Sequence, residues 1–441
     1  MTDAPLPPGP EHELSLDDIR GDRLEFLARM RTTYGPAVRY FTQDWEAVFL
    51  SDPAAVEQVL AGNFRGYGKE GTPDLRMLKP MLGDGLLTSD GAAWRAQRHV
   101  LAPLFKRNSV EAWAPVVQRH TQAMLSRWRV AQGHPFEVGG AFSHLTLEIA
   151  AEALFGYRLD DDGGRFAQAV DILNESMGGA HAHDGAHQGY LTAGALAVVQ
   201  DVVEQAIRAR RADPVSGAQD ALALMMDAQD ETGAALSERQ LLDQGVTLLL
   251  AGHETTAKAL SWAVYLLSLH PDAARRLRDE ARALPDDPSL SDLRRLPYTL
   301  AVLHEAMRLY SPIWVVSRIA LAEDCVAGYR IPKGTLIPLS PFLMHRDPAA
   351  WDAPDAFRPE RFLDEGTPQH PCQYIPFGAG PRQCIGRHFA LMEMHLVLAT
   401  LARHCTLDPL SDATVEAEAL VTLRPKGGLW MTPHFHEVAH A

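Results

Sequence analysis

The sequence predicts a mainly α-helical protein with a minor β part, and three observations carry this prediction. From about residue 93 to residue 310, apolar side chains recur with helical periodicity between loops rich in glycine, proline and aspartate. Segments with strand character lie outside this region, at 38–50, 314–319 and 328–339. One helical pattern, from residue 238 to about 269, is long enough to cross an entire core.

Local signals give the order of the first elements. Residues 5–10 are rich in proline and predict an extended arm. The apolar runs 38–41 and 47–50 flank a polar pair, which predicts a small hairpin. The dipeptide Asp52-Pro53 then predicts the start of a short helix, because proline is favoured in a first helical turn.

The long helical pattern has a defined start. Ser237-Glu238-Arg239-Gln240 forms a capping box. Apolar helix formers continue from there for roughly thirty residues, or about 45 Å. No repeat and no linker-like composition divides the chain, so we expect a single domain over residues 1–441.

Composition excludes several classes of partner. The 441 residues carry a formal net charge of −15 at pH 7, which argues against nucleic acid and against an anionic membrane surface. The N-terminus lacks the basic and apolar regions of a signal peptide. The most apolar stretch, 246–269, is interrupted by His253, Glu254 and Lys258, so it predicts a core helix and no membrane span. We expect a soluble, cytoplasmic protein with reduced thiols.

One of the four cysteines, Cys384, has unusual surroundings. It lies in Phe-Gly-Ala-Gly-Pro-Arg-Gln-Cys-Ile-Gly, residues 377–386, just before an apolar helical pattern. Arg382 and the positive end of that helix can stabilise a thiolate, and the glycines let a flat cofactor approach the backbone. The alternative is an inert buried cysteine in a glycine-rich turn. Taken together, the residues favour a thiolate ligand of haem iron.

This segment resembles the haem-binding loop of the cytochromes P-450, Phe-x-x-Gly-x-Arg-x-Cys-x-Gly, and all five fixed positions match. The resemblance implies a cytochrome P-450 fold, with a long oxygen-activation helix over haem b. It implies that Cys384 is the metal ligand, with Phe377, Gly378, Arg382 and Gly386 as the cofactor-binding residues around it.

The middle of the long helix carries a second pattern, Ala251-Gly252-His253-Glu254-Thr255-Thr256. Glycine and adjacent threonines are poor choices in a helix interior, and they predict a local opening of the helix. Glu254 beside Thr255 places an acid next to a hydroxyl, which can pass protons. A helix defect with a solvated glutamate is the alternative. The pattern is similar to the family's oxygen-activation segment. This implies that Glu254 and Thr255 are catalytic and assist proton delivery to the co-substrate O2, and that Ala251 binds the cofactor.

Two further patterns resemble the family's scaffold. Glu305 and Arg308 are three residues apart on one helix face, a spacing that is usually an exposed pair of little energetic weight. The resemblance implies instead a buried network with Arg361.

The propionates of the haem require cations, and Trp94 and Arg98 share a helix face suited to this role. The resemblance implies that both residues contact a propionate, and that Arg318 and Arg382 do so as well.

Substrate contacts are expected from four segments, 67–87, a lid at 177–191, 312–316 and 419–422. Their apolar residues point to a lipophilic small molecule, although the same side chains could belong to the core. The predicted contacts are Leu75, Leu78, Val315 and Val316.

Segments in the C-terminal third, at 309–314, 359–363 and 421–428, look like a bacterial branch that hydroxylates carotenoid rings. Fatty-acid hydroxylases share much of this pattern, so hydroxylation of a fatty acid or a terpenoid is the alternative. A protein of another class, a haem-thiolate sensor without turnover, would not need the Glu254–Thr255 pair.

Electrons are expected from a separate donor, because the 57 residues after Cys384 are too few for a flavin module, so no fused reductase is expected. Arg95, Arg98, Lys106 and Arg107 would form a basic patch on an acidic protein. The expected partners are therefore a ferredoxin and its reductase, or an equivalent donor.

Two histidine patterns do not indicate functional sites. His345-Arg346-Asp347 imitates a kinase catalytic loop, but the other kinase motifs are missing. His181, His183 and His187 lie in a glycine-rich stretch that is expected to be a solvated loop and not a metal site.

Overall fold

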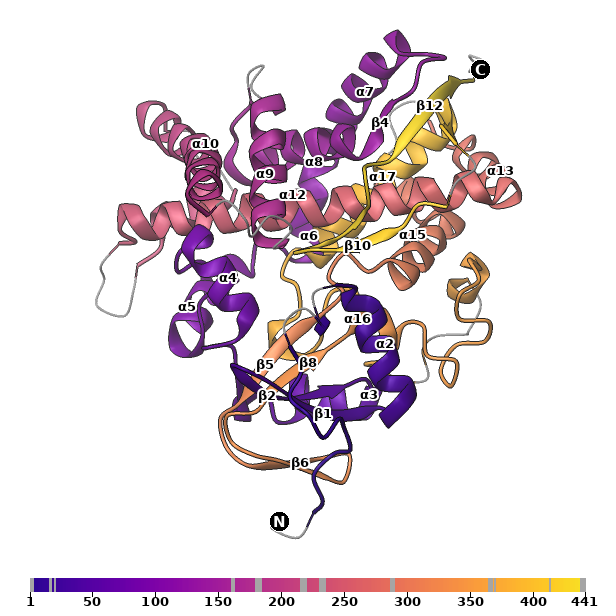
Figure 1. Cartoon of the computed structure of the whole chain (residues 1–441). Coiled ribbons are helices and arrows are strands. Elements are labelled where there is room, and N and C mark those ends of the chain that lie inside the picture. The colour runs from indigo at the N-terminus through magenta and orange to yellow at the C-terminus, as the bar shows by residue number, and fades with distance from the viewer. Residues whose placement is uncertain are drawn as a thin grey trace.

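The computed structural model describes residues 4–15, 18–19, 21–159, 163–178, 185–214, 220–229, 235–285, 290–363, 368, 370–411 and 414–436. Within these ranges a large helical region lies above a smaller region built around a sheet (Figure 1). The predicted class, mainly α with a minor β part, is confirmed. The main helices are α2 (Arg23–Tyr34), α3 (Pro53–Glu57), α4 (Pro73–Leu82), α5 (Gly91–Leu101), α6 (Arg107–Val110), α7 (Ala114–Val130), α8 (Val138–Phe155), α9 (Gly163–Gly178), α10 (Gly185–Ala212), α11 (Ala221–Asp227), α12 (Glu238–Leu269), α13 (Pro271–Ala281), α14 (Leu290–Leu293), α15 (Pro297–Leu309), α16 (Pro341–Met344) and α17 (Arg387–His404).

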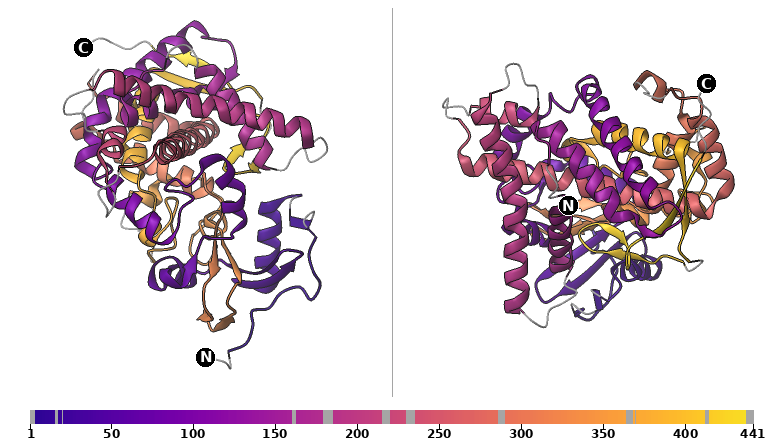
Figure 2. Two further views of the ribbon diagram at one scale, coloured as in Figure 1. Left: turned by 90° about the vertical axis from the view of Figure 1, so that its left-hand side faces the viewer. Right: turned by 90° about the horizontal axis from the view of Figure 1, so that it is seen from above.

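Helix α12 is the central element of the helical region. Its 32 residues begin with the predicted capping box, in which Ser237 accepts from the Gln240 amide while the Gln240 side chain accepts from the Ser237 amide. It packs against α8, α10, α15 and α17, and the left view of Figure 2 shows it nearly end-on with helices around it. At Gly245 a Cβ atom would lie 2.4 Å from Val203 of α10, so glycine permits this close approach.

The sheet of the lower region joins segments from both ends of the chain in the order β1-β2-β8-β5-β3. The predicted hairpin is confirmed as an antiparallel β1–β2 pair, and the predicted later strands form β5, β7 and β8. Strand β8 runs parallel to β2 and antiparallel to β5. The strands are β1 (Ala37–Thr42), β2 (Trp45–Leu50), β3 (Tyr67–Gly68), β4 (Phe136–Glu137), β5 (Val316–Ala320), β6 (Asp324–Val326), β7 (Tyr329–Ile331), β8 (Leu336–Leu339), β9 (Cys405–Pro409), β10 (Ala417–Ala419), β11 (Leu423–Pro425) and β12 (Trp430–Phe435).

The site region lies where these two parts meet. The largest cluster of buried apolar residues fills the helical region, and two smaller clusters lie on either side of the sheet. The β10–β11 hairpin and the loop before α17 connect the parts. In the described portion of the chain, none of the helices combines the length and apolarity that crossing a bilayer requires.

Parts of the predicted lid and the histidine stretch fall outside this description. Helices α9 and α10 border that segment, but residues 179–184 lie outside the described residues, as does the side chain of His187. His181 and His183 are among the residues not described.

Candidate active site

A cavity of about 1000 Å³ lies under the middle of α12 and collects most of the residues predicted for the site. Its other walls come from α4, α5, β5, the loop before α17 and the β10–β11 turn. Leu75 is not among the described residues that line it; its side chain is 3% exposed within the protein. The predicted residues on its wall are Leu78, Trp94, Arg98, Ala251, Glu254, Thr255, Val315, Val316, Arg318, Phe377, Gly378, Arg382, Cys384 and Gly386.

The loop of Cys384 is held by its own backbone. The Cys384 amide donates to the Phe377 carbonyl at 2.8 Å, which closes the loop just before α17. At Gly380 φ is +67°, and a Cβ atom there would lie 1.9 Å from the Leu60 carbonyl oxygen, so only glycine fits without a shift. These constraints present the thiol at the cavity wall.

The Cys384 thiol lies deep in the protein, yet its sulfur is uncovered on the side of the cavity. Burial raises the pKa of this thiol, while the Gly386 amide and the charges of Arg98 and Arg387 act in the opposite direction. The surrounding protein therefore does not by itself produce a thiolate. A coordinated metal ion would deprotonate this sulfur.

Cationic side chains gather on another part of the same wall. Lys69, Arg98, Arg318 and Arg382 all line the cavity. Within the described residues, only Arg382 of these four forms an ion pair, with Asp90. Burial lowers the pKa of Lys69 to about 8 and that of Arg318 to about 10, so both remain protonated at neutral pH.

Trp94 organises two of these cations. Its indole ring, buried on α5, lies 4.3 Å from the Arg382 guanidinium and 5.8 Å from that of Arg98. Stacking on an aromatic face fixes the direction in which a guanidinium presents its donors. Trp94 therefore holds both arginines at the cavity.

These residues fit haem b. Buried and half-buried cations in excess of nearby carboxylates call for an anionic partner, because an unpaired charge withdrawn from water is costly. Haem supplies two carboxylates at one edge for the cations and an iron at its centre for the uncovered sulfur of Cys384. When bound, it would supply the chemistry of O2 activation.

The segment predicted to serve in oxygen activation, residues 251–256, borders the cavity from α12. The Thr255 hydroxyl donates to the Ala251 carbonyl at 2.9 Å, and the Thr256 hydroxyl donates to the Gly252 carbonyl at 3.0 Å. The predicted local opening is wrong as stated: α12 is helical throughout this segment. The threonine hydroxyls bond one turn back, which satisfies them without breaking the helix.

Glu254 is buried at the cavity edge and has a partner from a distant part of the chain. The Thr422 hydroxyl donates to Glu254 Oε1 at 2.7 Å. Glu254 is 8% exposed and Thr422 is 4% exposed. The alternative of a solvated glutamate is therefore wrong, because this carboxyl group is removed from bulk water.

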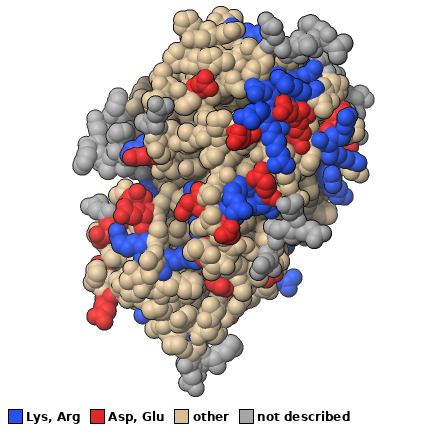
Figure 3. Space-filling model, turned by 90° about the vertical axis from the view of Figure 1, so that its right-hand side faces the viewer, with Lys and Arg blue, Asp and Glu red and all other residues tan. Residues whose placement is uncertain are grey.

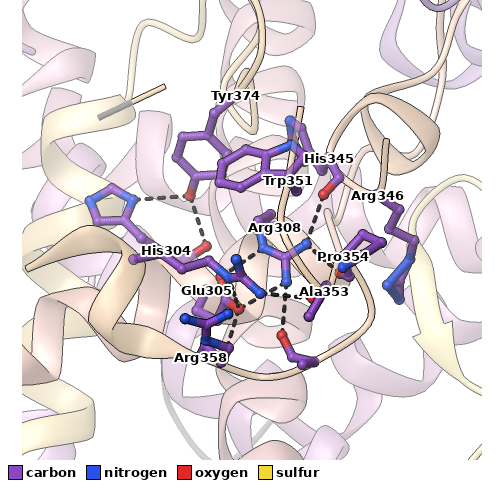
Figure 4. A network of polar contacts seen from close by, with 12 residues as sticks. His304, Glu305, Arg308, His345, Arg346, Trp351, Ala353, Pro354, Arg358 and Tyr374 are labelled. Atoms are coloured by element: carbon purple, nitrogen blue, oxygen red, sulfur yellow. Dashed lines mark hydrogen bonds and ion pairs between the residues drawn. The ribbon is translucent and has the colours of Figure 1, made fainter. Parts of the chain in front are cut away.

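Glu305 and Arg308 of α15 form a fully buried pair (Figure 4). Arg308 Nε and Nη2 donate to the two Glu305 carboxylate oxygens at 2.7 and 2.8 Å. Arg361 Nε donates to the same carboxylate at 3.2 Å. The remaining Arg308 donors reach the carbonyls of His345, Pro354 and Ala356. The structure thus brings together the three residues predicted for this network.

This network continues to the cysteine loop through His345. Arg308 binds the His345 carbonyl, and the His345 ring accepts the Ile375 amide at 2.9 Å. Ile375 lies two residues before Phe377, whose carbonyl binds the Cys384 amide. Burial lowers the pKa of His345 to about 3, so its ring stays neutral and can accept this hydrogen bond.

Sequence reasoning missed Lys69, Thr422 and His345. A lysine in a glycine-rich loop, a threonine in a turn and a histidine in an apparent kinase motif carry no local signal of their roles. The one available hint was that 67–87 and 419–422 were expected beside the substrate, since these segments contain two of the three residues.

Comparison with known proteins agrees with this geometry. Residues 12–431 match the family described as Cytochrome P450. The chain is 34% identical to cyclooctatin synthase of Streptomyces melanosporofaciens, over 93% of this chain and 91% of that protein. It is 32% identical to cyclooctat-9-en-7-ol 5-monooxygenase of the same organism, over 89% of this chain and 86% of that protein.

A solved structure extends the comparison to the fold. The crystal structure of the cytochrome P450DA haem domain superposes with a TM-score of 0.88 at 29% identity, over 99% of this chain and 98% of that one. The chain therefore belongs to the cytochrome P450 family: it is an oxidoreductase that uses haem b and O2 to oxygenate a lipophilic substrate, with electrons from a redox partner.

Proposed function

We propose that this enzyme hydroxylates an isoprenoid substrate, with the ring of a carotenoid as the leading candidate and a smaller terpenoid next. The reaction would consume substrate R–H, O2, two electrons and two protons, and yield R–OH and water. The cavity carries the proposal, because the Cys384 thiol, the Glu254–Thr255 pair and a largely apolar wall meet in one space.

The predicted residues that line the cavity, together with Lys69, have proposed parts in this reaction. Cys384 would ligate the haem iron through its sulfur, and the four cations Lys69, Arg98, Arg318 and Arg382, with Trp94, would hold the propionates. On the opposite wall, Glu254 and Thr255 would pass protons toward O2. Phe377, Gly378 and Gly386 would border the haem near the sulfur, and Ala251 would border it from α12.

The extent of the cavity supports a long, apolar substrate. From the cysteine loop it reaches Phe26 and Leu27 of α2 and Trp45 of the hairpin, so its lining spans both regions of the fold. Leu78, Val315 and Val316 lie along this path and remain proposed substrate contacts. A carotenoid ring could approach Thr255 while its chain extends toward α2.

The relatives support the isoprenoid class only in part. The name of one relative states that it oxygenates cyclooctat-9-en-7-ol, a cyclic alkenol. A bulky apolar ring beside Thr255 would be the shared requirement. This is the reason for keeping a terpenoid directly behind the carotenoid.

A fatty acid is the candidate after these isoprenoids, because a cationic side chain lies on the cavity wall near the β1–β2 hairpin. The exposed Arg76 of α4 stacks over Trp45 at 4.5 Å and forms no ion pair with any described residue. Such a guanidinium could bind a carboxylate while the alkyl chain enters the cavity.

A ferredoxin is the proposed electron donor, and the charge on the face beside Cys384 supports it. Arg95, Lys106, Arg107 and Arg387 are exposed there, and none of them has an ion-pair partner in the described ranges. Arg98, expected in this patch, faces the cavity instead.

Another arginine-rich face is less suited to an acidic partner. Figure 3 shows basic and acidic side chains intermingled on the side of the molecule that carries α13. Arg275 of α13 pairs with Asp272 at 2.8 Å, and Arg282, which caps the end of the helix, pairs with Asp279 at 3.3 Å. These charges compensate one another, whereas those near Cys384 remain available for steering.

The proposal is tested by titrating haem-loaded protein with β-carotene, a cyclic diterpene alcohol and a long-chain fatty acid while recording the Soret band. A shift to high spin with a carotenoid, followed by ring-hydroxylated product with ferredoxin, reductase and NADPH, is expected. A response to the diterpene alone or to the fatty acid alone would replace the carotenoid by that class. NADPH consumption that no ligand raises above background would favour the sensor alternative.

A further inference from the structure

The contact between Glu254 and Thr422 joins two parts of the site that are distant in sequence. Glu254 lies on α12 beside Thr255, and Thr422 lies in the turn between β10 and β11. Both side chains are buried and both line the same cavity. The 2.7 Å hydrogen bond from the hydroxyl to Glu254 Oε1 therefore restricts the carboxyl group at the place where its proton would be used.

The turn that carries Thr422 is anchored on both sides by indole rings. Trp314 Nε1 donates to the Leu420 carbonyl at 2.9 Å, and Trp262 Nε1 donates to the Leu423 carbonyl at 3.0 Å. The Leu420 amide also donates to the Thr422 carbonyl at 3.2 Å, which tightens the turn. The backbone under Thr422 is thus fixed at both ends, so its hydroxyl has a defined position.

Trp262 ties this arrangement to α12 itself. It lies two helical turns after Glu254 on the same helix, and its ring is fully buried. The helix therefore holds the turn at Leu423, and the turn in return holds the glutamate through Thr422. A mutual attachment of this kind positions the carboxyl group better than a single long side chain would on its own.

A bound substrate would contact the same turn. Leu420 and Val421, the two residues before Thr422, line the cavity together with Thr255. Anything that fills the cavity up to Thr255 would press on this turn.

We propose that Thr422 is a positioning residue of the proton relay: its hydroxyl holds Glu254 beside Thr255, and so directs protons to productive oxygenation. The inference rests on the proposed roles of Glu254 and Thr255. Without Thr422, the carboxyl group would rotate away, and O2 would take two electrons and two protons to leave as H2O2. The substrate would then stay unchanged.

The test compares Thr422→Val with Thr422→Ser, which keeps the hydroxyl. Thr335→Val is the matched control, because Thr335 is 1% exposed and its hydroxyl has no hydrogen-bond partner in the described part of the chain. With the best substrate from the Soret titration, we expect Thr422→Val to lower the yield of product per NADPH by about 10-fold, a part of what a whole proton donor contributes. The share of H2O2 and the solvent deuterium isotope effect should rise together, while Thr422→Ser and Thr335→Val should resemble the wild type.

A second measurement does not depend on turnover. Thermal unfolding of the wild type, Thr422→Val, Glu254→Gln and the double variant forms a double-mutant cycle. The double variant should lose less than the sum of the two single losses, because both remove the same hydrogen bond. Additive losses would show that the contact does not hold Glu254.

The outcomes separate this inference from the proposal beneath it. In one outcome, Glu254→Gln forms H2O2 while Thr422→Val gives the wild-type yield of product per NADPH. In that case Thr422 has no positioning role, and the proton relay through Glu254 and Thr255 is still supported. If Glu254→Gln and Thr255→Ala both couple like the wild type, the relay itself is wrong and Thr422 falls with it.

Discussion

The amide of Ile375 donates a hydrogen bond to Nε2 of His345 at 2.9 Å, and this bond connects the charge network of α15 to the cysteine loop. Arg308 fixes the His345 backbone from one side. The Ile375 amide begins the segment that continues to Phe377 and Cys384. The buried network of Glu305, Arg308 and Arg361 is thereby attached to the loop that holds the thiol.

Replacing His345 should loosen that attachment. We expect His345→Ala to lower the free energy of unfolding by about 1–3 kcal/mol, because a buried amide loses its acceptor. His345→Gln, which retains an acceptor, should lose less. Urea denaturation measures the difference, and the Soret band reports the sulfur ligand. Equal stability of His345→Ala and wild type would contradict the anchoring role.

The buried histidines predict a loss of stability in mild acid. Burial is the main cause that lowers the pKa of His253, His304 and His395 to about 4 and that of His345 to about 3. Between pH 6.5 and pH 4 these histidines bind protons in the unfolded chain but remain neutral in the folded protein. The free energy of unfolding is therefore highest above pH 6.5 and falls as the pH falls, by on the order of 1.4 kcal/mol per pH unit and histidine.

Urea denaturation from pH 7 to pH 4.5 measures this slope. The slope is proportional to the number of protons taken up on unfolding. His395→Gln should reduce that number by about one, since a glutamine does not titrate. Glu152 affects stability in a different pH range. Burial would raise its pKa, but hydrogen bonds from arginine and histidine partners lower it to about 2. Its contribution to the free energy of unfolding is therefore lost only below its ordinary pKa of 4.5. A slope that His395→Gln leaves unchanged would show that this ring is not neutral in the folded protein.

Lys69 predicts opposite effects on the empty and the loaded protein. Its side chain is 7% exposed, its ammonium group donates to the Leu87 carbonyl at 2.7 Å, and no described carboxylate pairs with it. Lys69→Met should therefore stabilise the apoprotein, because an unpaired buried charge is removed. The same variant should release haem about 10-fold faster, because a charged hydrogen bond to a propionate is lost.

Haem transfer to apomyoglobin measures the second effect, and thermal unfolding of the apoprotein measures the first. Lys333→Met is the control, since Lys333 is exposed. If Lys69→Met releases haem at the wild-type rate, Lys69 does not contact a propionate.

The contrast between these residues explains what the sequence could predict. Three features could be predicted because each lies within about ten consecutive residues. They are the cysteine loop, the capping box at Ser237 and the Glu305–Arg308 spacing. Thr422 and Glu254 are 168 residues apart, and their contact depends on a turn that Trp262 of α12 and Trp314 hold by hydrogen bonds to its backbone. The hydrophobic periodicity of a sequence does not predict such a contact.

Packing between elements distant in sequence also explains where the structure differs from the predictions. Glycine and threonine lowered the expected helix propensity of 251–256, but burial of α12 among α8, α15 and α17 outweighs propensity, and the helix stays continuous. Leu75 was expected at the substrate from its segment alone. Only the orientation of α4 shows that Leu78, and not Leu75, faces the cavity.

The buried pair of Arg308 and Glu305 should be far more sensitive to substitution than an exposed arginine–glutamate pair. Arg308→Lys loses the two-pronged contact and leaves carbonyl groups unpaired, so we expect a loss of about 3–5 kcal/mol. Arg330 binds Glu323 through two nitrogens at the surface, at 2.9 and 2.7 Å, and Arg330→Lys should cost less than about 1 kcal/mol. Similar losses in urea denaturation would show that burial does not set the strength of the network.

Two glycines of the cysteine loop offer a matched test of how the loop and the haem share space. Gly378 and Gly380 both have positive φ, +71° and +67°. A Cβ atom at Gly380 would collide with the Leu60 carbonyl, whereas one at Gly378 meets nothing within 4 Å in the described structure. Both alanine variants carry the backbone strain of about 1–2 kcal/mol, but only Gly380→Ala must also displace the chain at Leu60.

We therefore expect the apoprotein of Gly380→Ala to unfold at a clearly lower urea concentration than that of Gly378→Ala. Haem affinity should instead be lowered by Gly378→Ala. Gly378 lines the cavity, and its new methyl group would point into space that haem requires. Gly378→Ala should thus keep most of its apoprotein stability and still bind haem weakly. If Gly378→Ala binds haem like the wild type, the cofactor does not approach this stretch of backbone, and Gly378 would be retained for its φ alone.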